Sequence, residues 1–342
     1  MSILNTDSPV ELSRALIKAY KPQGFFRSMC KTVTHATKGF LIDVSEKTRV
    51  MAPYVRDDED GKFVAREGYT TLQYVPPKVG PKRNITGRDL ELRAAGQSVV
   101  DISADNANPE AVASSLVVED LLDMQASVER REEQQIVEIL TTGKLNTGIG
   151  ADIKAPIPSE NIVTLNANDK FDAANADPIK WMRSISRKKV VLHGGAAVGK
   201  AVFGGDAFDA FLQNSAVKTL LDNKRIELGS VAPRQDQMFP GVTYQGTIGG
   251  VEIYTYDEYY FDDKQKKDCP MVPEDRVILI GGNPRFEMHY GAVFDGAAGT
   301  VNKVQTYAWE WIESGKTRWR ELESHPLFVP VNGGAIVSAK VI

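Results

Sequence analysis

The chain has 342 residues, of which 42% are hydrophobic and 25% are charged, and its formal net charge is −4. These values are typical of a folded protein with one large or two moderate domains, and they exclude disordered, collagen-like and disulfide-framework chains. The mildly acidic balance argues against an obligate nucleic-acid binder, and no apolar run approaches the ~20 residues that span a bilayer.

The first 46 residues are predicted to form an arm. Ser8 and Pro9 precede an apolar stripe, so they predict a short amphipathic helix with Ser8 as its N-cap, and the segment 21–24 ends it. A lone helix with a narrow apolar stripe cannot bury itself. We therefore expect the arm to lie on another surface.

Residues 47–95 are predicted to form a long hairpin. Two strand-like runs, 50–55 and 63–75, flank an acidic segment, 57–61, whose Asp-Gly pair is a strong hairpin signal. Pro53 places the first run at a sheet edge. The ribbon has polar residues on both faces, and an isolated two-stranded hairpin is only marginally stable. We expect a partner surface to cover it, and none is obvious within the chain.

The longest predicted helix runs from about residue 109 to 142. Asn108 can cap it, Pro109 fits the first turn, and Gly143 lies just past its end. A rod of roughly 50 Å results, which is typical of a flat or elongated body. Its middle, residues 129–135, is almost entirely polar, and we interpret it as a solvated or intersubunit surface.

From Trp181 onward the pattern predicts a mixed α/β domain with its own core. It has a strand at 189–192 and a helix capped by Asp206. The aromatic residues at 307, 309 and 311 alternate along a strand of the tail, and we interpret them as cross-strand packing rather than a base-stacking platform. Further strands are predicted at 242–247, 251–256, 277–280, 286–290, 317–322, 328–331 and 335–342.

The most enzyme-like segment is the glycine-rich run at 194–200. It resembles a P-loop, but Ala201 stands where a magnesium-binding hydroxyl is needed and Gly204 interrupts the required helix, so we favour a simple connection. The segment 57–61 lacks the first ligand of a calcium loop, because Arg56 stands there. The histidines and cysteines show no metal-ligand spacing. The sequence therefore predicts no catalytic residue, metal or cofactor.

Five stretches, in this order and spacing, resemble the phage capsid protein E family, the lambda-type major capsid proteins of tailed phages. The resemblance implies an α+β chain with the tailed-phage major capsid fold, without enzyme activity, metal or cofactor. The stretches are 51–55 (Met-Ala-Pro-Tyr-Val), 74–86, 130–144, 177–179 (Asp-Pro-Ile), and 244–282 with the closing strands.

The resemblance also implies a division of the chain into four parts. An axial domain surrounds the capsomer centre, and a peripheral domain carries the long helix as its spine. The parts are the N-terminal arm (1–46), the extended hairpin loop (47–95), the peripheral domain (96–184 with 295–342, spine helix about 109–142) and the axial domain (185–294).

The implied function is that of the major head protein, which forms the hexamers and pentamers of an icosahedral phage head around double-stranded DNA. The implied partners are other copies of the chain, a scaffolding protein, a portal protein and often a decoration protein, with packaged DNA contacted non-specifically and no membrane. The implied location is the virion, with assembly in the host cytoplasm. Two alternatives remain: a prophage-derived nanocompartment shell, and a nucleotide-binding enzyme that uses residues 194–200.

The hairpin argument gives the assembly a mechanism. A ribbon without a core of its own gains one by lying on a neighbouring subunit, and the basic residues at its base are placed to meet acidic groups across the boundary. The predicted intersubunit contacts are Tyr54, Arg66, Tyr69, Tyr74, Lys78, Lys82, Arg83, Arg130 and Arg131.

Overall fold

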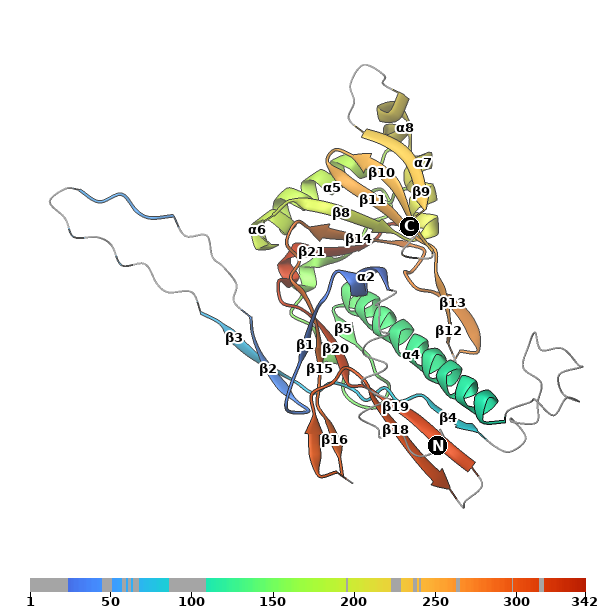
Figure 1. Cartoon of the computed structure of the whole chain (residues 1–342). Coiled ribbons are helices and arrows are strands. Elements are labelled where there is room, and N and C mark those ends of the chain that lie inside the picture. Colours follow the sequence, from blue (N-terminus) through green and yellow to red (C-terminus); the bar gives the residue numbers. More distant parts are fainter. Residues whose placement is uncertain are drawn as a thin grey trace, which may run out of the picture. The chain divides into compact units, whose positions relative to one another are not determined.

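The computed structural model groups the chain into two compact units, each built from separated segments (Figure 1). Unit 1 comprises 1–39, 75–136 and 288–328, and unit 2 comprises 40–74, 137–287 and 329–342. The arm helix predicted after Ser8 lies outside the described residues. The structure describes residues 24–44, 51–56, 60, 63, 68–85, 109–194, 196–222, 229–235, 239, 241–262, 265–296, 298–313 and 317–342.

The predicted long helix is α4 (Pro109–Thr142). Gly143 ends it with a φ of 73°, a conformation that glycine adopts without strain, and its N–H donates to the carbonyl of Ile139. In unit 1, Met124 and Val128 on its apolar face pack with Leu322, which anchors the helix on a small sheet.

That sheet has the strand order β18–β19–β4, with antiparallel pairing throughout. Its strands are β18 (Tyr307–Glu313), β19 (Thr317–Glu323) and β4 (Lys82–Ile85), so the two strands predicted around 307–311 and 317–322 are confirmed. A second three-stranded sheet has the order β1 (Lys31–Thr34), β15 (Phe286–Tyr290), β20 (Pro326–Pro330). The short helix α2 (Phe25–Ser28) precedes β1, and β16 (Val293–Asp295) pairs with β17 (Thr300–Asn302).

Unit 2 is built on a seven-stranded mixed sheet with the order β7–β21–β14–β8–β11–β10–β9. The helices α5 (Pro178–Ile185), α7 (Gly205–Gln213) and α8 (Ser215–Asp222) pack on it, and Phe203, Phe208 and Phe211 belong to the shared core. The strands are β7 (Ile162–Thr164), β8 (Val198–Phe203), β9 (Gly229–Gln235), β10 (Val242–Ile248), β11 (Val251–Tyr256), β14 (Arg276–Gly281) and β21 (Ile336–Lys340).

Three short ribbons complete the strands of the described residues, which also contain the 3-10 helices η2 (Ser159–Asn161) and η4 (Gly333–Ala335). β2 (Phe40–Val44) pairs with β3 (Thr70–Tyr74), and β5 (Lys144–Leu145) pairs with β6 (Ile153–Lys154). β12 (Tyr259–Asp262) pairs with β13 (Lys267–Pro270).

The strand predicted at 189–192 is wrong. Residues 186–190 form a π-helix, η3 (Ser186–Val190), and α6 (Val191–Gly194) continues it. The chain is therefore helical from Pro178 to Gly194. Asp177 starts this helical stretch, because its carboxylate accepts the N–H of Lys180. Of residues 186–190 only Val190 is fully buried, as expected for a helix that touches the core with one side. The strand propensity of the β-branched pair at 190–191 is outweighed by the packing of this helical stretch against the core.

The helix that Asp206 was expected to cap is two helices. Gly204 is the N-cap of α7, and Asp206 lies within its first turn. Asn214 separates the helices: its side-chain oxygen accepts the N–H of Ala216 and so caps α8. Its amide group donates to the carbonyls of Phe171 and Ala176, both 3.1 Å away.

The hairpin also differs from the prediction. The described residues 51–56 contain no strand, and the described strand pairing lies further back, with Phe40 opposite Tyr74 and Val44 opposite Thr70. β2 therefore lies in the segment predicted as arm. In addition, β21 belongs to the large sheet of unit 2, whereas the prediction placed 295–342 with the peripheral domain.

Candidate assembly surfaces

The hairpin loop carries large apolar side chains that contact almost nothing in their own chain. Tyr54 is 99% exposed and Phe63 is 92% exposed, and Met51 and Tyr69 are also exposed. Burying such a side chain is worth ~1.5–3 kcal/mol, so leaving four of them in water forgoes a large stabilisation. Exposed apolar groups concentrated on one segment mark a protein–protein contact. Arg66, another predicted contact, lies outside the described residues.

At the base of the ribbon, Tyr74 is buried within unit 2. Its hydroxyl donates to the carbonyl of Lys154 over 3.1 Å, and its ring packs against Phe40. Burial raises the pKa of Tyr74 to about 12. The side chain thus ties the ribbon to β6 and has little surface left for another subunit.

The two predicted cations Lys78 and Arg83 already have acidic partners in their own chain. The ammonium of Lys78 lies 2.7 Å from Glu321 and 3.2 Å from Glu323. The guanidinium of Arg83 lies 2.8 Å from Asp120 and 3.0 Å from Asp123 on α4. Because these cations are about half exposed, each ion pair contributes little free energy. Their contact with a neighbouring subunit stays a prediction.

Lys82 lies on the aromatic row of the tail. Its ammonium is 4.6 Å from the ring centre of Trp311 and 3.9 Å from that of Trp319, which are cation–π distances. The Tyr307 and Trp309 rings meet edge to face at 4.9 Å. The row is thus occupied by packing within unit 1, in agreement with the packing interpretation.

Arg130 and Arg131 are exposed on α4, and Arg131 donates to Gln134 over 3.2 Å. The interpretation of the whole segment 129–135 as a solvated or intersubunit surface is wrong, because Glu132 and Glu133 are only 1% and 2% exposed. Their partners are more than 100 residues away in sequence. The run of polar residues was the only sequence signal here, and it does not show which of these side chains are buried.

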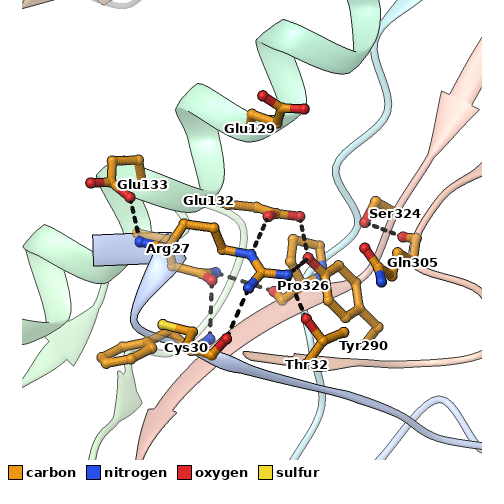
Figure 2. A network of polar contacts seen from close by, with 12 residues as sticks. Arg27, Cys30, Thr32, Glu129, Glu132, Glu133, Tyr290, Gln305, Ser324 and Pro326 are labelled. Atoms are coloured by element: carbon orange, nitrogen blue, oxygen red, sulfur yellow. Dashed lines mark hydrogen bonds and ion pairs between the residues drawn. The ribbon is translucent and has the colours of Figure 1, made fainter. Parts of the chain in front are cut away.

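Figure 2 shows how these glutamates hold the turn of α2 against α4. The Glu133 carboxylate accepts the backbone N–H groups of Phe26 (2.8 Å) and Arg27 (2.9 Å). The Glu132 carboxylate accepts hydrogen bonds from Nε–H of Arg27 (3.1 Å) and from the hydroxyl of Tyr290 (2.8 Å). We call Arg27, Glu132, Glu133 and Tyr290 the arm joint, because they hold the chain just after its N-terminal segment.

The guanidinium of Arg27 is held on its remaining sides as well. Its Nη2 donates to the hydroxyl oxygens of Thr32 (2.8 Å) and Tyr290 (3.1 Å), and Nη1 lies 3.5 Å from the carbonyl of Cys30. Desolvation raises the pKa of the nearby Cys30 thiol, so that thiol stays neutral. Arg27 is thus a buried cation whose guanidinium pairs with Glu132, while its backbone N–H donates to Glu133.

The glycine-rich run has the wrong order of elements for a P-loop. A P-loop follows a strand and opens a helix, whereas here α6 comes first and β8 follows. Lys200 lies inside β8, with its ammonium 3.1 Å from Glu252 and 3.4 Å from the Tyr254 hydroxyl. Over the described ranges, no cluster of three or more acidic, histidine or cysteine side chains could hold a metal ion. No helix in the same part of the chain is long and apolar enough to cross a membrane.

Comparisons with known proteins agree with these features. The major capsid proteins of Escherichia phage N15 and Enterobacteria phage phi80 are each 22% identical over 305 residues, which is 85% of this chain and 85% of each relative. The crystal structure of a putative capsid protein from a prophage of E. coli CFT073 superposes with a TM-score of 0.69 at 19% identity, over 97% of this chain and 96% of that one.

The similarity to the prophage protein shows a shared fold, the tailed-phage major capsid fold, and confirms the α+β class. The family model described as phage major capsid protein E matches residues 8–341, nearly the whole sequence. The chain therefore belongs to the phage major capsid protein E family.

Proposed function

We propose that this major capsid protein forms the hexamers and pentamers of an icosahedral head that encloses double-stranded DNA. The observation that carries the proposal is the exposure of Met51, Tyr54, Phe63 and Tyr69 on one loop, in a chain of a capsid-forming family. Such a loop is stabilised when a neighbouring copy covers it. Closed symmetry repeats the contact around each capsomer, so individually weak contacts add up.

The four-part division follows the same logic. Residues 1–46 act as the arm, 47–95 as the extended loop, 96–184 with 295–342 as the peripheral domain, and 185–294 as the axial domain. The two compact units support a split body, although their bounds differ from this division. Arm and loop together supply an interface above the ~1,000 Å² that specific contacts need.

The proposed partners are a separate scaffolding protein, a portal protein at one vertex and a decoration protein on the outer surface. The head assembles in the host cytoplasm and becomes the virion capsid. A net charge of −4 suits a shell that contacts DNA without binding it tightly, because strong phosphate contacts would oppose packaging and release. In this role the chain works without enzymatic activity, metal or cofactor.

Electron microscopy of the purified protein, alone and with its scaffolding protein, tests the proposal. We expect closed particles that contain six-fold and five-fold capsomers. A variant that lacks residues 56–63 should remain a folded, unassembled subunit. Soluble subunits that never close into shells under any of these conditions, or normal shells from the deletion variant, would contradict the proposal.

A second candidate is a nanocompartment shell of the same fold. Cargo enzymes that co-purify inside the particles, in place of packaged DNA, would favour it.

A further inference from the structure

The arm joint holds the short helix α2 with more hydrogen bonds than its position alone requires. α2 has only four residues, and a helix so short has no stability of its own. Glu133 grips two successive backbone N–H groups, which fixes the orientation of α2 as well as its position. The planar guanidinium of Arg27 adds contacts in several directions, so the turn cannot rotate without breaking hydrogen bonds.

Stability alone does not account for this arrangement. Burying a guanidinium and two carboxylates has a large desolvation cost, and apolar side chains of similar volume commonly give equal or better stability at such sites. What a buried polar set adds is directionality, because its hydrogen bonds are made in one geometry only. Unit 1 already has an apolar anchor nearby, since Phe25 and Phe26 are buried in the same turn.

Gly24 shows how closely the chain approaches the helix at this point. A Cβ atom at Gly24 would collide with the carboxylate of Glu133. The backbone at the base of the arm is therefore pressed directly against the glutamate that orients it.

We propose that the arm joint, with Gly24, sets the direction in which residues 1–23, the first part of the N-terminal arm, leave the subunit, and thereby which part of a neighbouring copy they reach. Twenty-three residues precede Gly24 in the sequence, so the backbone direction fixed at Gly24 is the direction from which that segment starts. The proposal rests on the proposed function, in which the arm lies on an adjacent subunit.

The test compares joint variants with a control on the same helix. Glu133→Gln removes the charge that holds two N–H groups, and Gly24→Ala forces the Glu133 carboxylate out of its position while keeping every charge. The control is Gln135→Met. Gln135 is equally buried on α4 and bridges Pro326 and Phe328 with two hydrogen bonds of 3.2 Å, neither of which involves α2. Urea midpoints of the unassembled subunits identify conditions in which variants and control are equally folded.

At matched folding we expect the joint variants to give at least tenfold fewer closed particles than Gln135→Met, with open or irregular shells instead. Amide exchange at Phe26 and Arg27 should accelerate in Glu133→Gln and stay slow in the control. If Glu133→Gln does not fold, Gly24→Ala decides.

Equal shell yields from joint variants and control, with normal shells from the unmodified protein, would overturn this inference and leave the proposed function standing. Failure of the unmodified protein to form shells would overturn both.

Discussion

Replacing both Tyr54 and Phe63 with serine should raise the protein concentration needed for assembly without weakening the subunit. The two side chains are almost fully exposed in the chain by itself, so each can gain its whole burial energy from a neighbour. At ~1.5–3 kcal/mol each, they contribute about 3–6 kcal/mol per subunit. Because 1.4 kcal/mol is a factor of ten, the concentration needed for assembly should rise at least about 100-fold.

Light scattering against protein concentration measures this threshold, and urea unfolding measures the subunit. The free energy of unfolding should change by less than ~0.5 kcal/mol, since neither side chain is buried in the subunit. The matched control is Tyr54→Phe with Phe63→Leu, which keeps the apolar area and should assemble near the normal threshold. An unchanged threshold in the serine variant would show that the loop does not provide the assembly energy.

Three further predictions concern unit cores, titration and nucleotides. Phe211→Ala should lower the free energy of unfolding by ~3–5 kcal/mol in urea titrations, because the ring is fully buried under the seven-stranded sheet; a loss below ~1 kcal/mol would contradict that packing. Burial, and then the adjacent His35, lower the pKa of His289 to about 4, so its contribution to stability is complete above pH 6.5 and is lost as the pH falls toward 4. His289→Asn should therefore flatten the decline in unfolding free energy between pH 6.5 and 4, and an unchanged slope would refute the assignment. Neither the unmodified protein nor the Lys200→Ala variant should bind ATP saturably. Saturable binding to the unmodified protein that is lost in the variant would support the nucleotide-binding hypothesis instead.

The sequence predicted those elements whose signals are local. The span of α4, the strands β10 and β11 and the tail strands β18 and β19 each follow from residue patterns within one short window. In each case residue propensity, capping or turn residues and the pattern of burial favour the same element. Prediction from a short stretch of sequence succeeds under that condition.

The misses share a different cause, since their deciding contacts are distant in sequence. Glu132 and Glu133 look solvated until Arg27, over 100 residues earlier, is placed beside them. The run at 189–192 has strand propensity, but it extends a helix that Asp177 starts twelve residues earlier. Among the predicted contact residues, the exposure of Tyr54 was recognisable because an Asp-Gly turn stands nearby, whereas the buried position of Tyr74 involves a hydrogen bond to the distant Lys154.

The position of β21 has a consequence for truncated chains. This strand lies between β7 and β14, and Ile336, Val337 and Ala339 are fully buried there. A chain that stops before residue 336 lacks the strand that joins β7 to β14, and two strand edges inside the sheet stay unpaired. Because such a product cannot complete the sheet of unit 2, we expect it not to compete with intact subunits for places in the shell.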